Sequence, residues 1–293
     1  MSDTSRQVLW LIRKSRLSTA GLVIVVGFVI VGLLAPYIVP YPEDARGESY
    51  NIERRFQPPS WEHPFGTDEY GRDVFSRVLM GARYSLIIAV GVVGLALLIG
   101  IPVGLVAGYV GGRLGSLLMR VTDMFLAFPP LLLAIALAAT LGRGLFNTII
   151  ALSISWWPWY ARLLYVKVTS VKAMPFVDSA RLLGLGRLAI MFRHVLPNSL
   201  TPVTVQAALD MGSAILEAAG LSFLGVGVDP SIPEWGLLVT EGWASISRAW
   251  WVSLFPGLAI LVTVLGFNLL ADALRESLDP RTRRIAFTRR ILG

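Results

Sequence analysis

Two acidic residues, Asp210 and Glu217, interrupt an otherwise apolar stretch that runs from about Asn198 to Val226. They are seven residues apart, so on a helix their side chains lie two turns apart on the same face. If this stretch crosses a membrane, such residues usually face a helix bundle or a water-filled path. Two carboxylates there could attract a cationic amino group, or Glu217 could hydrogen-bond to a neighbouring helix. The sequence leaves both interpretations open.

The other polar residues form no recognisable catalytic or metal-binding set. The chain has no cysteine and two histidines, His63 and His194, which we expect on opposite sides of a membrane in structural roles. The phosphate-binding pattern G-x-x-x-x-G-K-[ST] and the nucleophile pattern G-x-S-x-G are both absent. We therefore predict a chain that is not an enzyme and binds no ATP, metal or other cofactor itself.

The composition indicates a membrane protein. Of the 293 residues, 55% are hydrophobic and 15% charged, and the mean hydropathy is +0.65. The net charge of +7 comes from basic residues scattered between apolar segments, which is not the pattern of a nucleic-acid-binding domain. We expect contact with lipid and none with nucleic acid.

The elements that must position these residues are apolar helices, since a membrane-spanning helix needs about 20 apolar residues. The sequence predicts an all-α protein with six transmembrane helices, at about 18–39, 84–110, 123–141, 145–165, 198–226 and 253–274. A long polar loop covers 40–83, and 84–275 form the core. Residues 73–85 have helical spacing, typical either of an amphipathic interfacial helix or of a lead-in to the second span.

The distribution of basic residues predicts the orientation. With six spans, one side of the membrane holds 18 of the 26 lysines and arginines and the other side holds 8. Because cytoplasmic loops carry the excess, we expect a multi-pass protein with the N-terminal residues 1–17 and the tail 276–293 in the cytoplasm. The polar loop 166–197 then also faces the cytoplasm.

That cytoplasmic loop contains a short segment with its own helix signals. Pro175 suits a first helical position, Asp178 lies in the first turn, and Gly184 can end the helix in a left-handed conformation. A second helical piece would place Leu188, Phe192 and Val195 on one face before Pro197 opens the fifth span. Such an element can dock into a groove of a partner and transmit rigid-body motion.

This loop resembles the EAA loop of ABC importer permeases. That pattern has Glu-Ala-Ala, a glycine after three residues, and a later Leu-Pro. The corresponding residues here are Asp178, Ser179, Ala180, Gly184, Leu196 and Pro197. Asp replaces Glu and Ser replaces Ala, which changes size and not charge.

Further motifs are similar to the C-type transmembrane subunit of the dipeptide/oligopeptide (peptide/nickel) transport family. They are 63–68 (HPFGTD), 71–73 (GRD), 122–129 (TDMFLAFP), 221–225 (LSFLG), Trp235-Gly236 and Leu278-Asp279-Pro280-Arg281. The resemblance covers nearly the whole chain. Several motifs in the same order are more specific than any one of them.

The resemblance implies a type I ABC importer permease fold with a cytoplasmic coupling helix, in a prokaryotic cell membrane. It also implies a heterodimer with a B-type permease, two ATPase subunits that bind ATP and Mg²⁺, and an extracytoplasmic solute-binding protein. Peptides are the default cargo, with nickel, glutathione or another small solute as alternatives. An autonomous ion-coupled transporter and a membrane-embedded enzyme are the alternatives of a different class.

Overall fold

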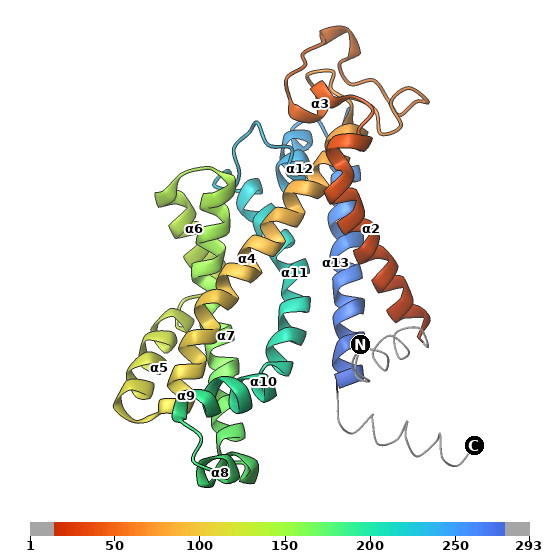
Figure 1. Ribbon diagram of the computed structural model, residues 1–293. Helices are drawn as coiled ribbons and strands as arrows, with labels where there is room; N and C mark the ends of the chain where they lie inside the picture. The colour runs from red at the N-terminus through yellow and green to blue at the C-terminus, as the bar shows by residue number, and fades with distance from the viewer. Residues whose placement is uncertain (1–14, 279–293) are drawn as a thin grey trace, which may run out of the picture. The chain divides into compact units, whose positions relative to one another are not determined.

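The computed structural model describes residues 15–278, and their regular structure is helical (Figure 1). One isolated antiparallel bridge joins Thr67 and Asp73. The elements are α2 (Arg16–Ile38), α3 (Pro42–Arg46), η1 (Ile52–Arg54), α4 (Val74–Val110), α5 (Gly112–Leu126), α6 (Pro130–Leu141), α7 (Leu145–Lys172), α8 (Pro175–Leu182), α9 (Arg187–Ala189), η2 (Ile190–Val195), α10 (Leu196–Ser199), α11 (Thr201–Phe223), α12 (Trp235–Trp243) and α13 (Trp251–Leu278). Most of the predicted cytoplasmic ends, and Asp279-Pro280-Arg281, lie outside the described residues.

Three helices are long and apolar enough to cross a membrane: α2, α4 and α13. The helices α5 and α6 pass the same test as a pair, which makes up to four spans within 15–278. The helices α7 and α11 have sufficient length, with 28 and 23 residues, but more polar sequences. The all-α membrane class is therefore confirmed, and the number six stays a prediction.

The predicted third span, 123–141, is wrong as a single helix. The chain forms α5 and α6, which are bent by 84° at a break after Leu126. Pro129 disfavours helical geometry at Phe128, which explains a break at this place. Arg113 and Arg120, which lie between the second and third predicted spans, are part of the helix α5.

The predicted helix at 73–85 is the start of α4, which continues for 37 residues. Val74, Val78 and Ala82 are all buried, so this helical turn packs inside the protein. This continuity agrees with the interpretation as a lead-in to the second span.

The chain divides into two compact units, and some helices pass from one to the other. The first contains 15–90, 138–149 and 208–278, and the second contains 91–137 and 150–207.

In the first unit, α2 and α13 lie side by side (Figure 1). A Cβ atom on Gly21 would come within 2.7 Å of Leu269 Cβ, so only glycine allows the two backbones to approach this closely. Small residues commonly permit such packing between helices in lipid. The Phe28 ring of α2 packs on the rings of Trp235 and Phe267, at centroid distances of 5.5 and 6.0 Å.

Residues 40–73 and α12 form a structured region of the first unit, here called the loop cap (Figure 1). A cluster of four charged residues joins the loop and the start of α4 to α12. Asp68, Arg72 and Arg77 are buried, and Glu241 is partly buried. Arg77 lies 2.9 Å from Asp68 and 2.5 Å from Glu241. Buried charges are tolerated when they are paired in this way. These ion pairs connect the long loop to α4 and α12.

His63 also belongs to the loop cap, and it is buried rather than a surface residue. Its Nδ1 lies 2.9 Å from Asp73 Oδ1, and its ring packs on Tyr41 at 5.0 Å. These contacts agree with the structural role predicted for this histidine. Between residues 15 and 278 no group of three His, Asp or Glu side chains is placed to bind a metal ion.

In the second unit, α4 packs closely on α7 along three glycines. A Cβ on Gly100 would come within 2.7 Å of Trp157 O, and one on Gly108 within 2.7 Å of Val168 Cγ1. Gly104 meets Ala161 in the same way. The Ser153 hydroxyl also donates to Val92 O at 3.2 Å. The two helices therefore pack as one rigid pair in this unit.

Candidate functional site

The short helix α8 forms where the sequence predicted a helix with defined ends. It begins at Pro175, which lacks the backbone N–H that a first helical residue does not use. Asp178 in the first turn accepts a hydrogen bond from Arg181 Nη1 at 2.8 Å, one turn later. The Ser179 hydroxyl donates to Pro175 O at 3.1 Å.

Gly184 ends this helix in the predicted left-handed conformation, with φ of +80°. Its N–H donates to Arg181 O at 2.9 Å, and Leu185 N–H donates to Ala180 O at 3.2 Å. These two bonds make a Schellman motif, which a residue with a Cβ atom would adopt only with strain. The helix therefore has a fixed length and a fixed exit direction.

The helix α8 and its C-terminal cap expose apolar side chains as well as burying them. Val177 and Ala180 are buried, yet large apolar side chains also face outward, with Leu182 89% and Leu183 81% exposed. Exposed apolar neighbours are Met174, Phe176, Leu185, Leu188 and Phe192. We call this set, with Leu182 and Leu183, the α8 surface. Contiguous exposed apolar residues mark interaction sites.

The segment after α8 differs from its prediction at one residue. Leu188 and Phe192 are exposed, whereas Val195 is fully buried, so the three do not share a face. Ile190–Val195 is a π-helical turn, η2, in which residues five apart align, and Ile190 and Val195 are both buried. Leu196 and Pro197 follow in the one-turn helix α10, and the long helix α11 starts at Thr201.

Lys172, which the sequence analysis did not single out, connects the base of α8 to α4. Its Nζ donates to Tyr109 O at 2.5 Å and lies 5.6 Å from the centre of the Tyr109 ring. Asp178 and Arg181 of α8 line, with Lys172, a cavity of about 580 Å³. The two contacting residues are 63 positions apart, so no local pattern could have indicated the contact.

Asp210 and Glu217 lie in α11, both half-buried, in the first unit. Both take part in interactions within the protein. Neither lines the cavity beside α8 or the cavity of the loop cap.

The fold and the α8 surface together define a class: a helical membrane protein with an exposed apolar loop element. Residues 100–284 match the family of inner membrane components of binding-protein-dependent transport systems. Residues 4–59 match the N-terminal transmembrane domain of oligopeptide transport permease C. The chain belongs to this family of transport permease subunits.

Curated relatives agree over most of the chain. It is 43% identical to a dipeptide transport system permease protein of Alkalihalophilus pseudofirmus, over 93% of this chain and 88% of the relative. It is 44% identical to a di/tripeptide transport system permease protein of Pseudomonas aeruginosa, over 91% and 88%. A glutathione transport system permease protein of Pectobacterium atrosepticum is 39% identical, over 90% and 86%.

Proposed function

We propose that this permease subunit forms, with a B-type permease, the membrane pathway of an ABC importer for di- and oligopeptides. Two ATPase subunits supply ATP hydrolysis, and an extracytoplasmic solute-binding protein delivers the cargo. Both termini and α8 face the cytoplasm in this proposal. Identities of 43% and 44% to dipeptide and di/tripeptide permeases support the cargo, and the family match supports the subunit role.

The α8 surface carries the proposal of a coupling helix. Asp178, Ser179, Ala180 and Gly184 belong to α8 or to its cap, and Leu196 and Pro197 follow the π-helical turn that packs against α8. The outward Leu182 and Leu183 would fill an apolar groove of an ATPase subunit. ATP-driven closure of the two ATPases would then draw the coupling helices together and open the permease pair outward.

Reconstitution tests the assembly. The chain is placed in proteoliposomes with the B-type permease, both ATPases, ATP and the binding protein, and uptake of a radiolabelled dipeptide is measured. We expect uptake only when all components are present. Uptake by this chain alone, driven by an ion gradient, would instead identify an autonomous transporter. Parallel uptake of nickel and of glutathione identifies the cargo.

The coupling helix is tested by substitution of its outward residues. Leu182→Ser and Leu183→Ser should leave the melting temperature of the chain nearly unchanged, because both side chains are exposed. Each should weaken binding of the ATPase subunits, as measured by their retention on the purified permease pair. Val177→Ser is the contrasting variant, since this buried side chain should mainly affect stability. Undiminished retention with both leucines replaced would contradict the proposal.

Asp210 and Glu217 are proposed to contribute negative charge to the pathway for the cationic amino group of a peptide. Their seven-residue spacing on α11 supports this, because both side chains share one helix face. Asp210→Asn and Glu217→Gln should reduce dipeptide uptake or alter the preference between peptides with free and blocked amino groups. Unchanged uptake and preference would remove this role.

A further inference from the structure

The helix α5 begins at a sharp turn and ends at a sharp bend. Gly111 and Gly112, which join it to α4, have φ of +68° and +58°, a conformation that glycine adopts far more readily than other residues. A Cβ atom on Gly115 would come within 2.6 Å of Ala107 O, so the first turn of α5 packs against the last turns of α4 (Figure 1). At the other end, the break before α6 bends the chain by 84°. The charged helix α5 is thus nearly perpendicular to the uncharged helix α6.

The side chains of α5 form three stripes along the helix. One stripe is buried against the protein: Gly115, Met119 and Thr122. The second is apolar, with exposed fractions between 38% and 65%: Leu114, Leu117, Val121 and Met124. The third is polar and exposed: Arg113, Ser116, Arg120 and Asp123. Steps of three and four residues keep each stripe on one face. An apolar stripe beside a basic one is typical of a helix that lies in the surface of a bilayer.

The two arginines of α5 carry positive charge without an acidic partner. The second unit has eight lysines and arginines but two acids, Asp123 and Asp178. Asp123 pairs with Arg162 of α7, and Asp178 pairs with an arginine of its own helix at 2.8 Å. Arg113 and Arg120 are exposed and form no ion pair with any residue between 15 and 278. The surface of α5 therefore attracts anions.

The helix α5 starts at the end of α4 that lies beside the coupling loop. Tyr109, two residues before Gly111, accepts the hydrogen bond from Lys172 at the base of α8. α4 is long and apolar enough to cross a membrane, and its apolar sequence continues to Val110. The turn after Val110 therefore lies at the level of the lipid headgroups. Anionic lipids of the cytoplasmic leaflet attract basic residues at this level.

The apolar stripe identifies the occupant as a lipid rather than a soluble anion. A free phosphate or a peptide carboxylate would contact Arg113 and Arg120 and leave Leu117 and Met124 in water. A phospholipid presents a charged phosphodiester and acyl chains together, so it covers both stripes. Arginine suits this position, because its apolar stem lies along apolar surface while its guanidinium reaches the phosphate.

We propose that α5 lies in the cytoplasmic surface of the bilayer and binds anionic phospholipids. Arg113 and Arg120 contact the phosphodiester groups, and the four exposed apolar residues contact the acyl chains. The inference goes beyond transport and takes from the proposed function only the cytoplasmic location of α8.

The test measures lipid binding to the complete assembly of both permeases and both ATPases in a neutral detergent. Phosphatidylglycerol is titrated, native mass spectrometry counts the bound lipids, and phosphatidylcholine is the neutral comparison. Arg113→Gln and Arg120→Gln should each weaken phosphatidylglycerol binding about fivefold, the factor expected for one basic residue near an anionic surface. Phosphatidylcholine binding should be unchanged. Undiminished phosphatidylglycerol binding with both arginines replaced would overturn the proposal.

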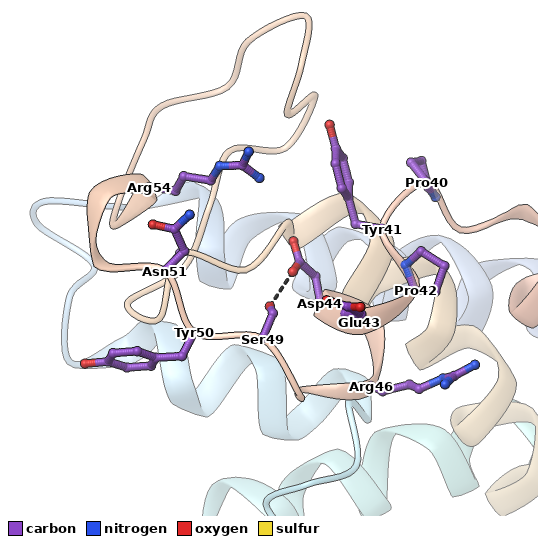
Figure 2. Close-up of a pocket in the computed structure, with 11 residues that line it drawn as sticks. Pro40, Tyr41, Pro42, Glu43, Asp44, Arg46, Ser49, Tyr50, Asn51 and Arg54 are labelled. Atoms are coloured by element: carbon purple, nitrogen blue, oxygen red, sulfur yellow. Dashed lines mark hydrogen bonds between the residues drawn. The ribbon is translucent and has the colours of Figure 1, made fainter.

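Two variants control for the loss of charge. A double variant with Arg113→Lys and Arg120→Lys keeps both charges and should bind phosphatidylglycerol within about twofold of the wild type. Arg46→Gln removes one exposed charge in the loop cap, where Figure 2 shows the side chain pointing away from Asp44 and Asn51, and should leave lipid binding unchanged. Equal losses in Arg46→Gln and Arg120→Gln would show an effect of total charge and contradict the proposal. Melting temperatures of all variants report folding.

A nitroxide label reports what surrounds α5 in the assembly. The chain has no cysteine, so Leu117→Cys supplies one labelling site when the partner subunits are also free of cysteine. Trp61→Cys, at a fully exposed position of the loop cap, supplies the aqueous reference. In nanodiscs the label at position 117 should collide more with oxygen, which concentrates in the bilayer, than with a water-soluble nickel complex. Shielding from both would mean that the second permease covers α5, and preference for the nickel complex would mean a water-filled path; either result rejects a lipid contact.

Two further measurements separate the remaining alternatives. Excess inorganic phosphate should not displace phosphatidylglycerol, and displacement would identify a site for soluble anions instead of lipid. Dipeptide uptake by the same preparation tests the proposed function separately. Its failure would reject the peptide importer and leave the lipid measurement valid, because lipid binding requires no transport.

Discussion

The ammonium group of Lys172 donates a hydrogen bond to the carbonyl oxygen of Tyr109 at 2.5 Å. Lys172 is the last residue of α7, and α8 begins at Pro175. The bond therefore fastens the start of the candidate coupling loop to the end of α4. Because α4 and α7 also pack closely along three glycines, a displacement of α8 should move both helices together.

Replacement of Lys172 tests this connection. Lys172→Met keeps an apolar stem of similar size but removes the donor, which should cost about 1–2 kcal/mol of stability. ATP hydrolysis by the full assembly should continue while dipeptide uptake falls, so that fewer peptides enter per ATP. The ratio of the two rates is the measurement. Lys167→Met on the same helix is the control, and an equal change there would show that loss of charge alone is responsible.

Gly184 should not tolerate a side chain. At a φ of +80° an alanine costs about 1–2 kcal/mol, so Gly184→Ala should loosen the end of α8. Faster proteolysis of this loop and weaker retention of the ATPases are the expected results. Gly186→Ala is the matched control, because Gly186 has ordinary backbone geometry and open space around its Cα. Similar behaviour of the two variants would contradict the importance of the cap.

The charge cluster of the loop cap predicts that replacing Glu241 by an uncharged residue strongly destabilises the protein. Glu241→Gln leaves the buried Arg77 with Asp68, which must also satisfy Arg72. Breaking such a buried pair should lower the free energy of unfolding by about 3–5 kcal/mol. Chemical denaturation of the purified chain in detergent measures it. Glu48→Gln, at an exposed position, should change stability by less than about 0.5 kcal/mol.

The buried carboxyl of Glu234, just before α12, should make the stability of the protein depend on pH. Burial raises the pKa of this carboxyl above its ordinary value of 4.5, although backbone N–H groups of Gly236 and Leu237 bond to it. The folded state therefore binds the proton more tightly than the unfolded state, and stability is lost as the pH rises from about 4.5 through the raised pKa. The melting temperatures of the wild type and of Glu234→Gln are compared across pH. The melting temperature of the variant should increase relative to that of the wild type as the pH rises.

Asp229 provides a comparison for that experiment, because its pKa is shifted in the opposite direction to that of Glu234. Hydrogen bonds from the Ser231 hydroxyl and N–H lower the pKa of the Asp229 carboxyl below 3.8. Its contribution to stability is present above the ordinary pKa and is lost as the pH falls. The advantage of the wild type over Asp229→Asn should therefore grow with pH. Equal pH profiles for the two variants would contradict the assignment of either shift.

Local patterns predicted the parts of the fold that depend on neighbouring residues. Pro175 and Gly184 predicted the two ends of α8, because the ends of helices favour specific residue types. The long apolar segments predicted α2 and α13, because a membrane-spanning helix needs about 20 apolar residues. The same patterns failed at Pro129, where a continuous apolar run hides a bend of 84°.

Contacts between distant segments could not be predicted from local sequence patterns. Glu241 and Arg77 are 164 positions apart, and nothing in either segment identifies the other. His63 lies in the polar loop 40–83, and no local pattern indicates that Asp73 and Tyr41 contact it. Val195 was placed on the wrong face because a π-helical turn changes which residues align.

The charge cluster also has a consequence for the synthesis of the chain. At about 5–20 residues per second, Glu241 leaves the ribosome roughly 8–33 seconds after Arg77. During that interval Asp68 is the acidic partner already made, and it must serve both Arg72 and Arg77. The loop cap therefore closes only after α12 has been made and delivered to the same side. A chain cut short before α12 would have Asp68 as the one carboxylate of this cluster for two arginines, Arg72 and Arg77.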